Sequence, residues 1–376
     1  MLQLGWKAGT EQYPPGELLD YVIAAEEAGF DSVDASDHFH PWSEQGQACF
    51  VWSWLGAAAA KTSRLVLGTG VTCPILRYHP AVIAQAAATV AALAPERFYL
   101  GVGTGEALNE YSATGAWPSY RVRQAQMIEA IELIRALWSG EKVTHRGEYY
   151  QTRGAKLYTR PPRPIPIYIS SLVPDSARIA GRHGDGLITV SGEEAEVYRE
   201  MLRKFDDGAR EAGKNPTTMS RMIEIGVAYT DDEEQAIACR KAYWAGSAIP
   251  AMYTERIYTP AMSEANGKAV GAETIKQSVY ISADPDEHVK MAQRYIELGF
   301  DHLIFHSGGP DQRAFIESYG RDVLPRLRSK TRNVRPAERR SGSGAERKRA
   351  PRPQQPAAGA RARPRARHAT GRKHAH

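Results

Sequence analysis

Short apolar runs alternate with longer amphipathic stretches along most of this 376-residue chain. Apolar runs bounded by turn residues are typical of strands, whereas apolar positions spaced three and four apart are typical of helices. Eight successive strand–helix units predict an α/β fold, a closed (β/α)8 TIM barrel with insertions. A doubly wound open sheet is the alternative. The predicted strands lie at residues 3–8, 32–35, 64–71, 98–103, 165–170, 185–190, 222–229 and 302–306.

Helix signals stand between the predicted strands. Pro14 and Pro15 open the first helix and Gly29 closes it. Another helix starts near Pro80, and the sequence HRGEYYQ after the fourth predicted helix is typical of a small hairpin. The remaining helices are predicted at residues 51–61, 122–138, 175–183, 193–213, 284–298 and 312–328.

The pattern changes in two places. Residues 230–282 form a long mixed insertion within the barrel domain, which we expect to span residues 1–328. Residues 329–376 hold 15 of the 48 basic residues and only two of the 43 acidic ones, so this tail is basic and the body is acidic. Because the tail is rich in Arg, Pro and Ala, we expect it to be disordered. It either contacts polyanions weakly or has no partner.

Composition narrows the class of protein. Apolar residues make up 42% of the chain, enough for a sizeable core. The three cysteines Cys49, Cys73 and Cys239 are scattered, which favours a reducing compartment. The N-terminal residues lack the layout of a signal peptide, and no apolar run has the length of a membrane span. These features predict a cytoplasmic protein without membrane contact.

Polar motifs follow several predicted strands, at the rim where TIM barrels carry their chemistry. The sequence SDHFHPW (36–42) follows the second strand and contains Asp37, His38, His40 and Trp42. A carboxylate beside a histidine can set the imidazole tautomer and shift its pKa. The alternative is an ordinary local hydrogen bond.

The sequence GVGTGEALNE (101–110) follows the fourth strand. It lacks the third glycine of a dinucleotide fingerprint, so we interpret it as a turn that brings backbone N–H groups to a ligand. Glu106 then projects as an acid or base, with Asn109 on the same face. The alternative role for Glu106 is to stabilise the helix dipole. Dispersed histidines predict no metal, and no GxSxG motif indicates a serine hydrolase.

Together these motifs resemble the luciferase-like monooxygenase superfamily, and more narrowly its branch that uses coenzyme F-420, typified by glucose-6-phosphate dehydrogenases. The resemblance runs from about Leu2 to Arg328. It rests on SDHFHPW, RYHPAVIAQA (77–86), GVGTGEALNE, LWSGEKV (137–143) and the PDQR…LPRLR sequence near the end of the body. It implies an F-420-dependent oxidoreductase acting on CH–OH groups, a (β/α)8 barrel and a homodimer.

The resemblance also implies roles for particular residues. His38 and Glu106 are expected to be catalytic acid/base groups, with Trp42 beside the reacting centre. The Val71–Thr72 bond is expected to be a non-prolyl cis peptide. The residues expected to bind the coenzyme are Asp37, Val71, Thr72, Cys73, Thr104, Gly105, Asn109, Leu172, Val173, Asp175 and Ser176.

This chain differs from the family enzyme at the positions expected to bind substrate. Where the family enzyme holds a phosphate, this chain has Val190, Glu193, Thr254 and about Ser278. A carboxylate at Glu193 repels a phosphate. Arg256, Lys268 or Lys276 could substitute for the missing cations. We therefore expect an unphosphorylated alcohol or sugar as substrate. The alternatives are a true F-420-dependent glucose-6-phosphate dehydrogenase, an FMN-dependent monooxygenase, and a non-catalytic binding protein.

Overall fold

A computed structural model describes residues 2–249 and 251–334. Eight parallel strands close into a barrel in the order β6-β5-β4-β3-β2-β1-β9-β7, with β6 pairing to β7 and a ninth strand, β8, added beside β7. The predicted barrel is confirmed, and the open sheet is excluded by this closure. The strands are β1 (Gln3–Ala8), β2 (Ser32–Ala35), β3 (Val66–Thr69), β4 (Phe98–Val102), β5 (Ile167–Ser170), β6 (Gly186–Val190), β7 (Ser220–Tyr229), β8 (Tyr280–Ser282) and β9 (His302–Ser307).

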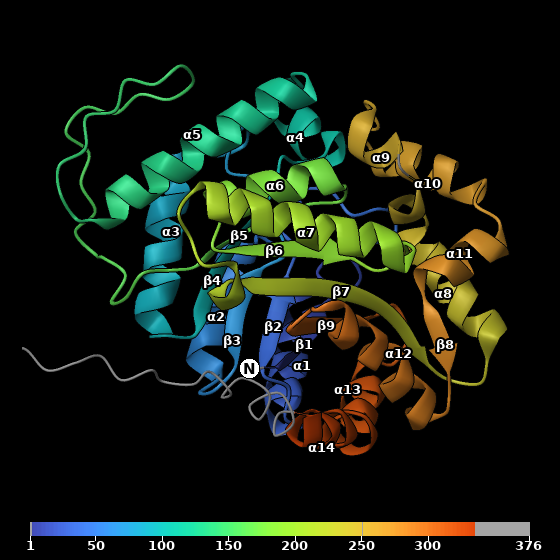
Figure 1. Cartoon of the computed structure of the whole chain (residues 1–376). Coiled ribbons are helices and arrows are strands. Elements are labelled where there is room, and N and C mark those ends of the chain that lie inside the picture. Colours follow the sequence, from blue (N-terminus) through green and yellow to red (C-terminus); the bar gives the residue numbers. More distant parts are fainter. Residues whose placement is uncertain (1, 250, 335–376) are drawn as a thin grey trace, which may run out of the picture. The chain divides into compact units, whose positions relative to one another are not determined.

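Helices surround the barrel, and α8 to α11 gather near the ends of β6 and β7 (Figure 1). The helices are α1 (Pro15–Glu27), α2 (Val51–Lys61), α3 (Pro80–Leu93), α4 (Ala107–Thr114), α5 (Tyr120–Trp138), α6 (Pro174–His183), α7 (Ala195–Glu211), α8 (Glu233–Trp244), α9 (Ala251–Thr254), α10 (Pro260–Lys268), α11 (Ala272–Ser278), α12 (Pro285–Leu298), α13 (Gln312–Asp322) and α14 (Leu324–Val334), with 3-10 turns η1 (Pro216–Thr218) and η2 (Ala245–Ala248).

Local sequence explains where these elements begin and end. Pro15 is the first residue of α1, where its missing N–H costs nothing, and Gly29 follows the helix at φ +88°. The Asp284 side chain accepts a hydrogen bond from the Asp286 N–H at 2.8 Å and caps α12, which Gly299 ends in the left-handed conformation. Both helices therefore lie close to their predicted positions.

The structure corrects the prediction in three segments. The GEALNE turn continues into a short helix, α4, which Gly115 ends at φ +70°. The predicted insertion contains helices α8 to α11 and the extra strand β8. The predicted final helix is two helices, because Pro325 lacks the N–H and clashes with the carbonyl one turn before it.

The predicted tail starts too early. Residues 329–334 belong to α14, which is held by the fully buried side chains of Leu324 and Leu327 and so continues past residue 328. Residues 335–376, and with them most of the predicted basic tail, lie outside the described residues. The HRGEYYQ segment carries an antiparallel bridge between Arg146 and Gln151, consistent with the predicted hairpin. No helix in the described ranges has the length and apolar character needed to cross a bilayer.

A polar layer fills the barrel just below the ends of its strands. Lys7 from β1 lies 3.5 Å from Asp34 of β2 and 3.0 Å from Glu224 of β7, and Glu224 accepts a hydrogen bond from His306 Nδ1 of β9 at 2.8 Å. Burial disfavours the charge on Lys7, but Asp34 and Glu224 outweigh this effect and raise its pKa. Burial raises the pKa of Asp34 to about 6, against the opposing effect of Lys7.

A second histidine lies deeper in the barrel. His302 of β9 is buried, and its Nε2 lies 2.6 Å from the Ser32 hydroxyl, while Nδ1 has no hydrogen-bond partner among the described residues. Burial lowers the pKa of His302 from 6.5 to about 3. The folded protein therefore keeps this imidazole neutral, whereas the unfolded chain protonates it near its ordinary pKa.

This difference predicts how stability changes with pH. Between pH 6.5 and 3, His302 is protonated in the unfolded state and neutral in the folded state. The free energy of unfolding therefore falls as pH falls, by on the order of 4 kcal/mol in total. Asp34 acts in the opposite direction between pH 6 and 4. Urea unfolding of wild type and His302→Gln across pH 4–7.5 isolates the histidine's contribution. His183→Gln, at the less buried end of α6, is the control. A pH-independent difference between H302Q and wild type would contradict the prediction.

Candidate active site

His38 lies in the loop after β2, between two carboxylates. Its Nε2 is 3.6 Å from Glu11 Oε1 and 3.8 Å from Glu106 Oε2. On the other side of the ring, Nδ1 lies 3.2 Å from the His40 carbonyl oxygen. A carbonyl only accepts, so the neutral imidazole carries its proton on Nδ1. The lone pair of Nε2 then faces the two carboxyl groups and is free to accept a proton.

Glu106 comes from the other side of the rim, directly before α4. Burial raises the pKa of its carboxyl group, and the nearby Glu11 and Glu110 add to this effect while His38 opposes it. Its side chain makes no hydrogen bond that caps α4. Its predicted role as an acid or base stays a prediction, as does the alternative role in stabilising the helix dipole.

Glu11 is a member of this group that the sequence analysis missed. It follows β1 by three residues, is 1% exposed, and accepts a hydrogen bond from the Thr10 hydroxyl at 2.9 Å. The signal was present, since β1 ends at the same rim as β2 and β4. The segment after β1 contains no histidine motif and no paired glycines, so the sequence analysis interpreted it as an ordinary connection to the first helix.

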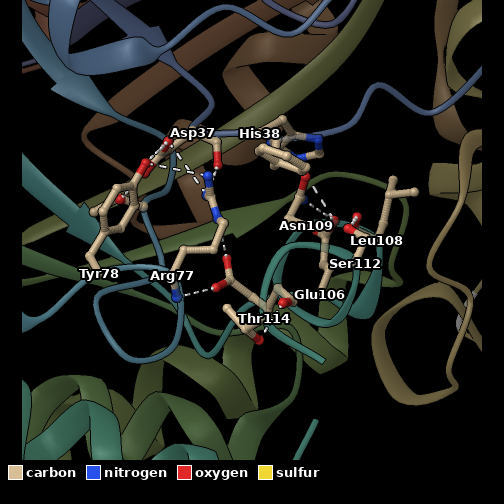
Figure 2. Close-up of polar contacts among 12 residues, drawn as sticks. Asp37, His38, Arg77, Tyr78, Glu106, Leu108, Asn109, Ser112 and Thr114 are labelled. Atoms are coloured by element: carbon tan, nitrogen blue, oxygen red, sulfur yellow. Dashed lines mark hydrogen bonds and ion pairs between the residues drawn. The ribbon is translucent and has the colours of Figure 1, made fainter. Parts of the chain in front are cut away.

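Asn109 joins the two loops that carry His38 and Glu106 (Figure 2). Its Oδ1 accepts hydrogen bonds from the backbone N–H groups of Phe39 at 2.8 Å and His40 at 3.1 Å. Its Nδ2 donates to Glu106 Oε2 at 3.3 Å. One buried amide therefore sets the separation of the two acid/base candidates.

Asp37 points away from His38 and into the protein (Figure 2). Its carboxylate accepts hydrogen bonds from the Thr72 hydroxyl and from the Tyr78 hydroxyl at 3.0 Å, and it lies 3.5 Å from the Arg77 guanidinium. Arg77 also donates to the Asp37 backbone carbonyl at 2.6 Å. Asp37 thus ties the His38 loop to the loop after β3. Its predicted contact with a coenzyme stays a prediction.

Arg77 links the same loop to α4. Its backbone N–H and its Nε donate to the two oxygens of Glu110, at 3.0 and 2.9 Å. Both side chains are largely or fully buried, so the pair is shielded from solvent screening. Loops after β2, β3 and β4 are therefore held in one network around His38.

The non-prolyl cis peptide lies at Gly70–Val71, one position before the predicted Val71–Thr72 bond. β3 ends at Thr69, and an added side chain at Gly70 would overlap the Asp34 carboxylate, so only glycine fits there. The Gly70 carbonyl accepts hydrogen bonds from Lys7 Nζ at 2.6 Å and from the Ser36 hydroxyl at 3.3 Å. The register of the strand end explains the one-residue error.

Other predicted coenzyme residues line the neighbouring turn. Thr72 and Cys73 are buried, and burial raises the pKa of the Cys73 thiol well above its ordinary value. Gly105 has φ +78° and lies so close to Cys73 Sγ that no Cβ would fit. The Thr104 carbonyl accepts a hydrogen bond from Arg123 Nε at 3.2 Å. The structure therefore brings the loops after β3 and β4 together.

Apolar side chains are exposed at the carboxyl ends of three strands. We call Phe39, Leu172, Val173 and Val190 the apolar rim; their exposed fractions lie between 36% and 54%. Ser171, beside them, has a buried hydroxyl without a hydrogen-bond partner among the described residues. Exposed apolar side chains beside an unpaired polar group are typical of a surface that a ligand covers.

Two further predicted residues flank this rim. Asp175 is exposed and pairs with Lys204, and the Ser176 hydroxyl donates to the Val173 carbonyl at 2.8 Å. Neither side chain is buried or left without a partner. Their predicted contact with a coenzyme stays a prediction.

Trp42 lies over His38, with ring centroids 5.3 Å apart. It packs in an apolar cluster that we call the roof, which joins the barrel loops to the insertion. The Tyr253 ring lies edge-on to Trp42 at 6.3 Å. The roof consists of Trp42, Leu108, Tyr243, Trp244, Ile249, Met252, Tyr253 and Ile257. Most of these residues come from the predicted insertion, which therefore covers the site.

The predicted substrate residues lie beside a separate cavity of about 380 Å³. Glu193 and Ser278 line it, and Val190 ends the adjoining strand β6. Lys276 also lines it, but this ammonium pairs with Glu233 at 2.5 Å and with Glu273 at 3.5 Å. The side chain of Thr254, at the end of α9, lies outside the described residues. No group of three or more potential ligands is placed to hold a metal within the described ranges.

Comparison with known proteins places this geometry in a family. The family model described as luciferase-like monooxygenase matches residues 2–302. The chain belongs to this family. The match covers the whole barrel up to the start of β9 and includes every loop that contributes to the site.

Individual relatives match over a longer part of the chain. An F420-dependent glucose-6-phosphate dehydrogenase of Mycolicibacterium gilvum is 45% identical over 331 residues, which are 87% of this chain and 98% of the relative. The protein with the same description from Beutenbergia cavernae is 44% identical, over 89% of this chain and 100% of its own. A solved F420-dependent secondary alcohol dehydrogenase, in complex with an F420-acetone adduct, aligns with a TM-score of 0.83 and 37% identity, over 87% of this chain and 99% of that one.

The role of Asn109 leads to a stability prediction. Asn109→Ala leaves the N–H groups of Phe39 and His40 without their acceptor, so we expect a loss of roughly 2–3 kcal/mol in the free energy of unfolding. Asn266→Ala on α10 is the matched control, since that exposed amide makes one hydrogen bond to a backbone carbonyl. Urea unfolding measures both. Equal stabilities of N109A and N266A would contradict the positioning role.

Proposed function

We propose that this chain is a coenzyme F420-dependent oxidoreductase that transfers a hydride between a carbinol carbon and the deazaflavin. The observation that carries the proposal is His38 Nε2, held between the buried carboxyl groups of Glu11 and Glu106 at the rim of the barrel. The named activities of relatives that share 37–45% identity over nearly the whole barrel support the same chemistry.

The residues at the rim fit a deazaflavin. The bound coenzyme supplies the hydride acceptor or donor. The apolar rim offers contacts for an aromatic ring system, and the unpaired Ser171 hydroxyl can bond to a polar ring edge. We propose that the loop Val71–Cys73, the turn with Thr104, Gly105 and Asn109, and the segment Leu172–Ser176 hold the coenzyme.

We propose the following proton transfers, which the geometry supports. When the alcohol is oxidised, the carbinol C–H bond breaks as hydride leaves, and the hydroxyl proton moves to His38 Nε2, whose lone pair faces the site. Glu11 lies 3.6 Å from this nitrogen and stabilises the imidazolium that forms. Glu106, whose pKa is raised by burial, holds a proton at higher pH than an ordinary carboxyl group and serves as the partner acid.

Trp42 and the rest of the roof exclude water from this exchange. Trp42 is 5% exposed and contacts both His38 and the insertion. A dry environment strengthens the attraction between the imidazolium and its carboxylates. We propose that Trp42 packs beside the reacting carbon and fixes its orientation.

The substrate is proposed to be an unphosphorylated alcohol or sugar. In the cavity beside β6, Glu193 lies where a phosphate would need a cation, and Lys276 is already paired. A second candidate is glucose 6-phosphate, which the descriptions of the 44–45% identical relatives favour. We propose further that the protein is a cytoplasmic homodimer; its three cysteines are free, in keeping with a reducing compartment.

Coenzyme binding and turnover test the function. We expect oxidised F420 to bind with at least tenfold higher affinity than FMN in a fluorescence titration, and its absorbance to fall with a neutral alcohol more than with glucose 6-phosphate. Tight FMN binding without F420 binding would overturn the proposal in favour of a flavin monooxygenase. Efficient oxidation of glucose 6-phosphate would instead overturn only the substrate assignment based on Glu193.

The acid/base roles have their own test. His38→Asn and Glu106→Gln should each lower kcat by 10²–10⁴ while F420 affinity changes less than threefold. In wild type kcat/KM should fall at high pH as Glu106, whose pKa is raised by burial, loses its proton, and E106Q should lack this descending limb. H183Q, distant from the rim, should match wild type. Loss of F420 binding in proportion to kcat would indicate binding roles instead.

A further inference from the structure

Arg240 is a buried cation that the proposed reaction does not use. It lies in the last turn of α8 and is 8% exposed. Its Nε and Nη1 atoms are sealed from solvent, and neither donates a hydrogen bond to any residue in the described ranges. Arginine stays charged in proteins even when buried.

An unpaired buried charge is costly, by several kcal/mol, unless a partner arrives from elsewhere. The other cations near the site already have partners. Lys7 pairs with Asp34 and Glu224 inside the barrel, and Lys276 pairs with Glu233. Unlike Lys7 and Lys276, Arg240 can therefore still bind an anionic ligand.

The surroundings of Arg240 connect it to the cluster that covers the candidate site. Its guanidinium lies 5.6 Å from the centre of the Trp244 ring, which belongs to the roof. The Trp244 ring in turn lies 4.4 Å from His306, and its indole N–H donates to Gln12 Oε1 at 3.1 Å. Trp244 and Trp42 pack in the same roof, and the Trp42 ring lies 5.3 Å from His38, so packed rings connect the guanidinium to the site.

Electrostatics agrees with this placement. Burial lowers the pKa of Arg240, while Glu224, Tyr253 and Glu11 act to raise it. Burial raises the pKa of Tyr253, Glu106 and Glu224 add to this effect, and Arg240 opposes it. Together with its contact with Trp244 of the roof, these influences indicate that Arg240 belongs to the same region of the insertion as the groups that cover His38.

We propose that Arg240 binds a carboxylate of the substrate, so that the substrate is a hydroxy acid whose carbinol lies at His38. This inference rests on the proposed function and names its substrate class. A guanidinium matches the planar shape and the single charge of a carboxylate. A phosphate would bring a charge of about −1.5 to −2 toward Glu11 and Glu224, more than one guanidinium balances, so the carboxylate fits better.

The roof makes this recognition selective. A neutral alcohol leaves Arg240 unpaired in a dry environment, whereas a hydroxy acid supplies the missing acceptor. Sites that leave a buried polar group unpaired with the wrong substrate discriminate strongly against it. The basic candidates named from the sequence do not serve this role: Lys268 is exposed and near Glu264, and Arg256 lies over Tyr111.

Kinetics with matched substrate pairs tests the proposal. The pairs are 2-, 3- and 4-hydroxybutanoate against butan-2-ol and butan-1-ol, and glycerol 3-phosphate against glycerol, each with F420 absorbance as readout. We expect kcat/KM for at least one hydroxybutanoate to exceed that of its neutral partner by 30-fold or more. Arg240→Met should remove that advantage mainly through KM, and Arg240→Lys should keep part of it. Lys241→Met, the exposed neighbour on α8, is the charge-matched control and should behave as wild type.

A binding measurement separates this inference from the proposed function. At constant ionic strength, acetate should raise the melting temperature of wild type and K241M by several degrees relative to chloride, and should not raise that of R240M. This acetate measurement tests carboxylate binding by Arg240 even if no alcohol is oxidised. A lack of alcohol oxidation would overturn only the proposed function. If R240M does not fold, R240Q and R240K take its place.

Three results would overturn the Arg240 assignment. The first is a hydroxybutanoate advantage that persists in R240M, and the second is the absence of any such advantage in an active wild type. The third is an equal effect of acetate on wild type and R240M, or no effect on either. A preference confined to glycerol 3-phosphate and lost in R240M would replace the carboxylate by a phosphate.

Discussion

A single buried ammonium group holds together the strand ends that carry the site. Lys7 Nζ contacts Asp34, Glu224 and the Gly70 carbonyl, and so joins β1, β2 and β7 to the loop after β3. Burying the Lys7 charge is unfavourable unless each of its partners stays in place. The strand ends that carry these partners are therefore held in fixed positions. Because the Gly70 carbonyl belongs to the cis bond, the same ammonium fixes the loop that is proposed to hold the coenzyme.

The acid/base group above this layer depends on a second set of buried contacts. Asn109 sets the distance between the His38 loop and Glu106, while Asp37 and Arg77 tie that loop to the loops after β3 and β4. These hydrogen bonds join loops that follow different strands and are far apart in sequence. Preorganised contacts of this kind keep reacting groups in place without reorganisation during the reaction. The barrel therefore supplies a site in which one proton acceptor faces two carboxyl groups.

Periodicity in the sequence was enough to predict the eight barrel strands and the rim where the motifs meet, since both follow from local pattern and a topological rule. The same rule places the segment after β1 at this rim, but Glu11 was missed because a lone glutamate in a connecting segment is not part of a motif. Periodicity could not place the cis bond, whose position depends on where β3 ends against Asp34, or split the final helix at Pro325 when the apolar pattern continues. Arg240 looks like any basic helix residue until the fold shows that its face is buried.

These contacts explain why the groups proposed for proton transfer and those proposed for substrate recognition come from different parts of the chain. Every group assigned to proton transfer comes from a loop directly after a barrel strand, where the polar layer holds it. Arg240 and most of the roof come from the insertion, which touches the barrel mainly through packing. Packing contacts of this type tolerate substitution of similar volume better than buried ion networks tolerate loss of a partner. The proposed substrate choice can thus change at Arg240 in the insertion and at Glu193 after β6 without disturbing the contacts that hold His38.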